Sequence, residues 1–425
     1  MENNVTDILI HIVGLGVTDQ ANLSGEATAA LQGAGLVMGS ERQLAVVEHL
    51  LSDSQTTMVL PAFKQLGNTL ETLQREGLPQ LVVLASGDPL FYGIGRWFAN
   101  NFDKGQLRFY PAISSIQAAC HQLGLSQQDV DVISLHGRPL FTLRRKLKQQ
   151  KTLVILTDKN STPSLLAQEC AAAGFDQSTL WVCETLGYPE QKVSEFSVAE
   201  LLETNQSFDP LHVTVIQTRG IGRVFPEFPG IEDTAFVTDK GSGKGMITKR
   251  EVRLGILSLL QPAAGDVIWD VGAGCGSVAV ELAYWNEKAR VCAIEHHAER
   301  QSCLEENQQR FGVVDNLELI NDRAPACLKD LPTANKVFIG GSDGELPQLL
   351  DQVWQQLPEW GVLVASAVME PTRQQLLQFL QTHQSDAETE TLQIAVSKGE
   401  TLAGQLVYKP NLPVTLFKLT KQSCK

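Results

Sequence analysis

The chain of 425 residues lacks three features that would each assign it to a broad class of protein. Its longest apolar run, residues 361–369, is far below the roughly 18 residues that cross a bilayer. Its eight cysteines include no C-x-x-C pair, which argues against a zinc site or a disulfide framework. Its first residues carry no basic stretch of the kind that opens a signal peptide. We therefore expect a cytoplasmic protein with no membrane and no metal partner.

Positive charge is also scarce. Lysine and arginine number 34 against 48 aspartates and glutamates, which gives a net charge of −14. A protein that grips a nucleic acid backbone needs the opposite balance, so we expect no nucleic acid partner. Hydrophobic residues make up 43% and charged residues 19%, which is typical of globular chains and excludes a disordered one. The length favours two or three domains.

Short apolar runs alternate with helical patterns throughout, which predicts an α/β protein. In the first half we expect strands at 8–13, 81–85, 107–110, 131–134, 152–156, 179–184 and 212–216, and helices at 21–32, 64–76, 114–122 and 162–173. In the second half we expect strands at 267–270, 290–295, 317–320, 336–339, 361–365, 392–396 and 414–419, and helices at 275–284, 297–310, 346–356 and 372–382. No helical pattern separates the last two strands, which predicts an antiparallel hairpin at the sheet edge.

Glycines and prolines interrupt this alternation between residues 219 and 244 and indicate a linker. A new helix is expected to begin at Thr248, because residues 248–251 (TKRE) match a capping box. We therefore predict one domain at 1–218, a linker at 219–232 and a second domain at 233–425.

The second half carries a nucleotide-type fingerprint. Residues 270–276 (DVGAGCG) lie where a strand gives way to a helix, and Glu295 closes the next strand roughly twenty residues later. Glycines let the backbone turn tightly against a ligand, and the carboxylate can accept hydrogen bonds from ribose hydroxyls. Proteins that bind dinucleotides and proteins that bind S-adenosylmethionine both have this glycine loop followed by an acidic residue. The carboxylate of Asp270 would repel a pyrophosphate but suits a cationic sulfonium, which favours S-adenosylmethionine and leaves an NAD-dependent dehydrogenase as the alternative.

Further polar groups lie near the expected sheet edge. Asp322 and the amide near Ala324 follow the third strand and could reach an adenine edge. His296 and His297 adjoin Glu295, but adjacent side chains at a helix start should point in different directions, so we expect a solvated helix end. Residues 241–245 (GSGKG) fail the P-loop spacing. The basic run 144–148 predicts a solvated helix face, with contact to substrate carboxylates as an alternative.

Residues 246–253 (MITKREVR), 270–276 and 338–342 (FIGGS) carry a family resemblance. From about residue 233 to its end the chain resembles the decarboxylating precorrin methyltransferases of cobalamin synthesis, which have a Rossmann-like class I fold. The loop pattern and this resemblance imply a donor site at Asp270, Gly272, Gly274, Gly276, Glu295, Asp322 and Ala324, with Thr248 at its entrance.

Three loops of the first half, residues 13–19 (VGLGVTD), 85–95 (ASGDPLFYGIG) and 111–117 (PAISSIQ), resemble those of the tetrapyrrole methylase superfamily. That resemblance implies a two-lobed class III fold with S-adenosylmethionine in the cleft between the lobes. Residues 134–139 (SLHGRP) and 184–190 (ETLGYPE) narrow it to the branch that methylates carbon 5 of a precorrin. The implied donor-binding residues are Gly14, Gly16, Gly87, Asp88, Ser114 and Ser115. Asp88 and His136 are candidates for a catalytic polar role near the acceptor.

Together the two halves resemble the bifunctional precorrin-6Y C(5,15)-methyltransferases. The resemblance implies methylation of carbons 5 and 15 of a precorrin, decarboxylation of an acetate side chain, two S-adenosylmethionine sites per chain and a homo-oligomer through the second domain. In-line methyl transfer depends on alignment, so it requires few acid–base residues. Val17 stands where the family usually has a third glycine, which motivates a second alternative, in which the first half only binds a tetrapyrrole.

Overall fold

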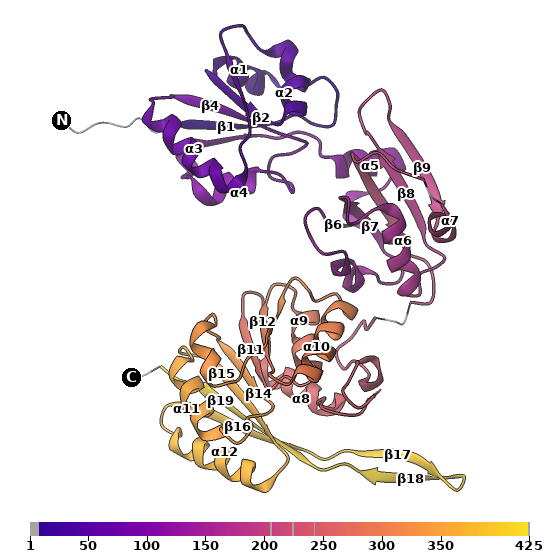
Figure 1. Cartoon of the computed structure of the whole chain (residues 1–425), viewed down its shortest axis with the longest axis vertical. Helices are drawn as coiled ribbons and strands as arrows, with labels where there is room; N and C mark the ends of the chain where they lie inside the picture. Colours follow the sequence, from indigo (N-terminus) through magenta and orange to yellow (C-terminus); the bar gives the residue numbers. More distant parts are fainter. Residues whose placement is uncertain (1–7, 205, 223–224, 242, 424–425) are drawn as a thin grey trace, which may run out of the picture. The chain divides into compact units, whose positions relative to one another are not determined.

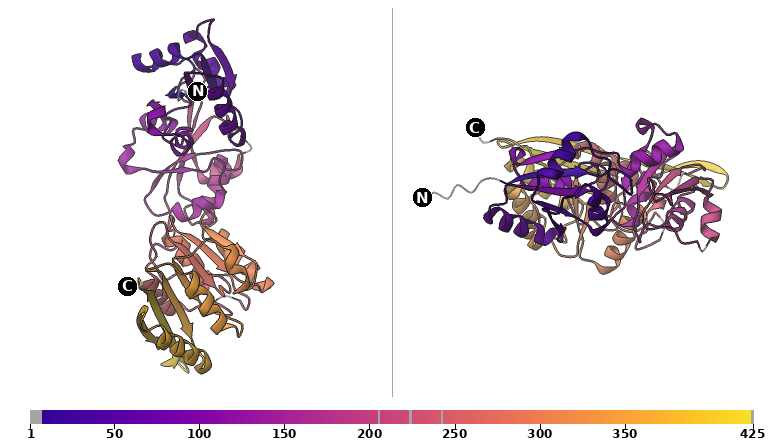
Figure 2. Two further views of the ribbon diagram at one scale, coloured as in Figure 1. Left: turned by 90° about the vertical axis from the view of Figure 1, so that its left-hand side faces the viewer. Right: turned by 90° about the horizontal axis from the view of Figure 1, so that it is seen from above.

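The computed structural model describes residues 8–204, 206–222, 225–241 and 243–423, which form two compact units (Figure 1, Figure 2). The first unit contains the chain up to Arg138 together with Gln149–Gly222, and the second contains Pro139–Lys148 together with the chain beyond Gly222. Both are built from strands and helices in alternation, so the expected α/β class is confirmed. None of the helices in the described ranges is long and apolar enough to cross a membrane.

The first lobe of the first unit is a parallel sheet in the order β3-β2-β4-β1-β5. Its central strands β1 (Leu9–Gly14) and β4 (Gln80–Ala85) are almost wholly buried, which is why they form continuous apolar runs in the sequence. The other elements are β2 (Leu36–Gly39), β3 (Thr56–Val59), β5 (Leu107–Tyr110), α1 (Gly25–Gly33), α2 (Glu41–Val47), η1 (Glu48–Leu50), α3 (Phe63–Arg75), α4 (Gly95–Asn101) and η2 (Lys104–Gln106).

The second lobe is a mixed sheet in the order β6-β7-β10-β8-β9, in which β6 and β7 are the parallel pair. Its strands are β6 (Asp131–Ser134), β7 (Thr152–Leu156), β8 (Thr179–Glu184), β9 (Lys192–Ser197) and β10 (His212–Gln217). Its helices are α5 (Ser115–Leu123), η3 (Gln127–Asp129), α6 (Pro163–Ala172) and α7 (Val198–Glu203). The sequence patterns missed β2, β3, β9, α2, α4 and α7, each of which is four to seven residues long.

The second unit is a three-layer sandwich around a sheet in the order β13-β12-β11-β14-β15-β19-β16. Helices α8 (Arg250–Leu260), α9 (Ser277–Trp285) and α10 (Ala298–Arg310) cover one face, and α11 (Leu346–Gln356) and α12 (Glu370–Thr382) cover the other (Figure 1). The parallel strands are β11 (Val267–Val271), β12 (Arg290–Ile294), β13 (Leu317–Ile320), β14 (Lys336–Ile339) and β15 (Val362–Ala367). The 3-10 helices η5 (Asp233–Ala235) and η6 (Ala326–Asp330) complete the unit.

The end of the chain departs from the expected simple hairpin. Strands β16 (Ala387–Ile394) and β19 (Val414–Lys421) do pair antiparallel, but β19 lies inside the sheet, between β15 and β16. Between them β17 (Ser397–Leu402) and β18 (Gln405–Pro410) form a separate arm that projects from the sandwich (Figure 1). All residues of β17 and β18 are exposed, so no buried face left a pattern in the sequence.

The expected capping box at Thr248 is wrong. Helix α8 begins at Arg250, its N-cap residue is Lys249, and no side chain caps it locally. The amide of Arg250 instead donates to the Asp233 carboxylate at 3.0 Å. A carboxylate distant in sequence has thus replaced the local cap.

The segment expected to be a linker is partly built into the second unit. Ile231, at 3% exposure, belongs to its hydrophobic core. The amides of Gly230 and Ile231 both donate to the buried carboxylate of Glu281, at 2.9 and 3.0 Å. The sequence did not predict these hydrogen bonds, because Glu281 lies about fifty residues later in the chain.

The basic run at 144–148 is also not a solvated face. Residues Pro139–Lys148 belong to the second unit, where Leu140–Lys146 forms the 3-10 helix η4. Arg145 is buried, donates to Asn316 Oδ1 at 2.9 Å and pairs with Asp315 at 3.6 Å. Lys146 pairs with Glu287 at 2.6 Å. These basic side chains are therefore neutralised within the protein rather than presented to a ligand.

Candidate active sites

Three loops of the first unit surround a cavity of about 840 Å³. The loops follow β1, β4 and β5, and the second lobe closes the other side with residues such as Thr157 and Tyr188. The structure brings together several of the predicted residues in the cavity lining: Gly16, Gly87, Ser114, Ser115 and His136. The donor and acceptor positions expected from the loop motifs therefore lie in one space.

Backbone contacts set the shape of this cavity. The amide of Gly87 donates to the carbonyl of Gly16 at 3.1 Å and joins the first two loops. A Cβ on Gly14 would lie 2.6 Å from the carbonyl oxygen of Gly87, so only glycine allows this junction. Gly14 itself lines a neighbouring cavity of about 460 Å³ instead of the larger one. In the third loop Ser114 caps α5, where its Oγ accepts from the amide of Gln117 at 3.2 Å.

Asp88 has a different position from the one expected of a catalytic group. Its carboxylate accepts from the amides of Leu90 and Phe91 at 2.8 and 3.1 Å, and it does not belong to the lining of either cavity. It therefore shapes the turn that carries Leu90, Phe91 and Tyr92, which do line the larger cavity.

In the second unit the glycine loop connects β11 to α9 at the carboxyl ends of the parallel strands. Gly272, Gly274 and Gly276 all have positive φ, at 73°, 59° and 85°. A Cβ on Gly272 would lie 2.8 Å from the backbone of Gly341, in the loop after β14. The loop is thus packed too closely for side chains. Its backbone amides donate within the protein: those of Gly272 and Ala273 to the carbonyl of Ile294 at 3.0 Å, and that of Cys275 to the carbonyl of Met246 at 3.0 Å.

Two buried carboxylates lie beside this loop. Glu295 accepts from the amide of Gly274 at 2.9 Å and from the amides of His296 and His297 at 3.0 and 2.9 Å. Asp270 is 1% exposed, and neither of its oxygens has a hydrogen-bond partner among the described residues. Burial, together with the nearby charge of Glu295, raises the pKa of Asp270 to about 7. A buried carboxylate without a partner calls for a cationic or donor ligand, so these residues fit the sulfonium and ammonium groups of S-adenosylmethionine.

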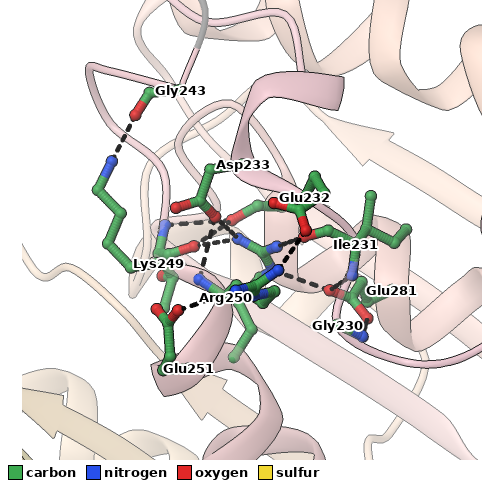
Figure 3. A network of polar contacts seen from close by, with 12 residues as sticks. Gly230, Ile231, Glu232, Asp233, Gly243, Lys249, Arg250, Glu251 and Glu281 are labelled. Carbon is green, nitrogen blue, oxygen red and sulfur yellow. Dashed lines mark hydrogen bonds and ion pairs between the residues drawn. The ribbon is translucent and has the colours of Figure 1, made fainter. Parts of the chain in front are cut away.

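A charged network holds the segment before α8 (Figure 3). The fully buried guanidinium of Arg253 donates to Glu281 at 2.9 Å, to Asp233 at 2.7 Å and also to the carbonyl of Thr248. The amide of Thr248 donates to Ser277 Oγ, at the start of α9, at 3.1 Å. Thr248 is therefore held by its backbone next to the start of α9.

Asp322 and Ala324 follow β13 at the same edge of the sheet, and Asp322 is exposed. The expectation that His296 and His297 diverge is wrong, because their ring centroids lie 4.1 Å apart. Ligand atoms of these histidines and Glu295 lie within 4.8 Å of one another. The Glu295 carboxylate already accepts three backbone hydrogen bonds there.

The sequence analysis missed three arginines. Arg42, Arg96 and Arg138 all line the cavity of the first unit. Arg138 lies inside the 134–139 motif and Arg96 directly follows the 85–95 motif, so both could have been noticed. Arg42 lies on α2, a helix that the patterns did not predict, and nothing in the local sequence marks it.

Comparison with known proteins assigns a family to each of the two units. The model of the tetrapyrrole (corrin/porphyrin) methylases matches residues 9–202, and that of the precorrin methyltransferase domain matches residues 239–421. A precorrin-6Y C(5,15)-methyltransferase [decarboxylating] from Sinorhizobium sp is 32% identical over 412 residues, 96% of each chain. Its counterpart from Mycobacterium tuberculosis (strain CDC 1551 / Oshkosh) is 30% identical over 97% of this chain and 100% of the relative. A precorrin-6Y C5,15-methyltransferase structure from Geobacter metallireducens GS-15 covers 46% of this chain and 99% of its own, at 32% identity and a TM-score of 0.43.

Two classes of methyltransferase domain thus follow one another along the chain. The chain belongs to the family of the decarboxylating precorrin-6Y C(5,15)-methyltransferases. The resemblance drawn from the sequence motifs is confirmed.

Proposed function

We propose that the chain transfers methyl groups from S-adenosylmethionine to carbons 5 and 15 of a precorrin and removes carbon dioxide from an acetate side chain, in cobalamin biosynthesis. The first unit carries the carbon-5 reaction, and the second carries the carbon-15 reaction with decarboxylation. The observation that carries this proposal is a tightly turned glycine loop at the carboxyl ends of parallel strands in each unit, in a chain matched along its length by bifunctional relatives.

S-adenosylmethionine supplies an electrophilic methyl group bound to a sulfonium. A new carbon–carbon bond forms as the carbon–sulfur bond breaks, so the protein has to align the two partners and exclude water. In the first unit we assign donor binding to Gly16, Gly87, Ser114 and Ser115, and an acceptor contact to His136. Asp88 acts there through the turn that it caps.

In the second unit we assign the donor to the glycine loop between two buried acids. Asp270 faces the cationic end, Glu295 the ribose, and Asp322 with the backbone near Ala324 the adenine. Thr248 borders the entrance, where its backbone is fixed by Arg253 and Ser277.

Titration calorimetry of S-adenosylhomocysteine into the whole chain tests for two donor sites. We expect two sites in the natural chain and one each in the variants Gly87→Ala and Gly272→Ala, where a Cβ would approach Ser114 Cα at 3.1 Å and Gly341 at 2.8 Å. Gly77→Ala and Gly265→Ala are matched controls, because both glycines have positive φ but open space around them. One site in the natural chain would contradict the proposal.

Two further measurements, methylation assays and thermal melting with NADH, separate the alternatives. A chain with a non-catalytic first unit would methylate carbon 15 but not carbon 5 of a precorrin. An NAD-dependent dehydrogenase would bind NADH in the second unit, and NADH would then raise its melting temperature where S-adenosylhomocysteine does not. The buried, unpartnered carboxylate of Asp270 beside the loop disfavours that outcome, because it would repel a pyrophosphate.

We also propose that the chain forms a homo-oligomer through its second unit and acts in the cytoplasm. The β17–β18 arm carries exposed apolar side chains at Leu402, Leu406 and Tyr408, between 66% and 70% exposed. A two-stranded ribbon with unpaired edges is a ready surface for a second copy. Sedimentation of the variant Leu406→Glu should show a smaller species than the natural chain, and an unchanged mass would contradict this role of the arm.

A further inference from the structure

The cavity of the first unit has an unusual charge for this protein. The chain carries 14 more acidic than basic residues, yet no aspartate or glutamate occurs among the described residues that line the cavity. Three arginines line it instead: Arg42, Arg96 and Arg138. We propose that these three side chains bind carboxylate groups at the rim of the tetrapyrrole and so select a polycarboxylate acceptor for carbon-5 methylation. This inference rests on the proposed function of the first unit.

The three arginines differ from most others in the chain by lacking an acidic partner. Eight other arginines in the described ranges form ion pairs with carboxylates, whereas Arg108, Arg219 and Arg310 do not; the eight are Arg75, Arg145, Arg250, Arg253, Arg290, Arg300, Arg323 and Arg373. Arg42, Arg96 and Arg138 form no ion pair within those ranges, and all three are exposed. In a protein with an excess of carboxylates, guanidinium groups without one are available to an anionic ligand.

The arginines come from separate elements around the space. Arg42 lies in the first turn of α2, where its Nη2 donates to Ser86 Oγ at 3.1 Å, beside Gln43, whose Nε2 reaches the same oxygen at 3.0 Å. Arg96 lies in the first turn of α4, and Arg138 follows β6. Three cations on different elements match several carboxylates around one ring better than they match a single anion.

The rest of the lining suits the body of such a ligand. Leu90, Phe91 and Tyr92 line the cavity and remain 54%, 41% and 50% exposed, which is high for large apolar side chains. Phe91 and Tyr92 pack edge to face with ring centroids 5.2 Å apart. The turn that presents them is fixed by the carboxylate of Asp88. An apolar surface bordered by arginines is complementary to a large ring with acidic side chains.

A carboxylate could also come from the donor, since S-adenosylmethionine carries one on its methionine part. The two possible sources of the carboxylate, acceptor and donor, predict the loss of different binding affinities when the arginines are removed. If the arginines bind the acceptor, their removal weakens precorrin binding and leaves S-adenosylhomocysteine binding intact. If one of them holds the donor carboxylate, S-adenosylhomocysteine binding falls with it.

The test uses the full-length chain with the single variants Arg42→Gln, Arg96→Gln and Arg138→Gln, and with the corresponding lysine variants. Arg75→Gln is the matched control, because Arg75 is an exposed arginine on α3 outside the cavity. We measure the KM for a precorrin and kcat in carbon-5 methylation at two salt concentrations, carbon-15 methylation in the same preparations, and S-adenosylhomocysteine affinity by calorimetry.

We expect each glutamine variant to raise the KM for the precorrin roughly tenfold, as loss of a charged hydrogen bond does, with kcat within about twofold. The lysine variants should recover part of this loss, and the salt dependence of KM should become shallower. Carbon-15 methylation, S-adenosylhomocysteine affinity and Arg75→Gln should match the natural chain.

An unchanged precorrin KM in all three glutamine variants would overturn the proposal, and so would a loss of S-adenosylhomocysteine affinity without a change in KM. A natural chain that does not methylate carbon 5 at all would overturn the proposed function of the first unit and this inference with it. Carbon-5 methylation by the natural chain therefore distinguishes a failure of the arginine proposal from a failure of the proposed function.

Discussion

The glycine loops of the two units lie in opposite charge environments. In the second unit the glycine loop lies beside two buried carboxylates, Asp270 and Glu295, and a buried arginine holds the neighbouring segment. In the first unit no described acidic residue lines the cavity, and hydroxyl caps and backbone contacts shape it. If both units bind the same donor, as we propose, the difference teaches that donor chemistry alone does not decide the charge of a site, because the shape of the loops and the charge of the acceptor contribute as well.

The largest effect should come from breaking the charge-built framework of the second unit. Arg253→Met leaves the buried carboxylate of Glu281 without its guanidinium partner, so we expect a loss of about 3–5 kcal/mol in the stability of that unit. Differential scanning calorimetry and chemical denaturation measure it. Arg290→Met is the matched control, because Arg290 forms an exposed pair with Glu318 and should change stability by less than about 1 kcal/mol. Equal losses in both variants would contradict a framework held by buried charge.

A smaller effect, with a distinct pH signature, is expected at Asp270. Its pKa is raised to about 7 in the folded chain from 3.8, so the folded state holds the proton more tightly than the unfolded one. The stability that this proton contributes is complete below about pH 3.8 and is lost as the pH rises through 7. Asp270→Asn should therefore melt higher than the natural chain at pH 8, retain a smaller advantage at pH 6, and differ little only near pH 4.

The same variant should bind S-adenosylhomocysteine about tenfold more weakly in the second unit, because a neutral amide replaces the carboxylate that we propose to face the ligand's ammonium group. Asp351→Asn, an exposed acid on α11, is the control. A donor affinity equal to that of the natural chain would remove Asp270 from the site.

The smallest effect tests the first unit. Ser114→Ala removes the side-chain cap of α5 and should lower stability by about 1 kcal/mol. Ser197→Ala removes the same type of cap from α7, away from the cavity, and should give a similar loss. Only Ser114→Ala should weaken donor binding in the first unit. If both serines affect donor binding alike, the hydroxyl of Ser114 has no role beyond the helix.

The sequence predicted those parts of the fold that local composition controls. Buried strands such as β1, β4 and β11 are continuous apolar runs, and the glycine loop with Glu295 has a fixed spacing, so both were visible. The features that were missed depend on partners distant in sequence. Asp233 replaces the local cap of α8, and Asp315 neutralises Arg145. The arginine set of the cavity exists only once α2, α4 and the loop after β6 have come together.

One feature of the chain bears on how its two activities could be separated. The polypeptide leaves the first unit after Arg138, contributes Pro139–Lys148 to the second, and returns. Leu143, fully buried there, and Arg145, at 6% exposure, would lose their cover if the chain were cut once near residue 222. The isolated first half should therefore be prone to aggregation. Supplied together, the two halves should recognise each other through this segment, which would make the enzyme suitable for complementation between separate polypeptides.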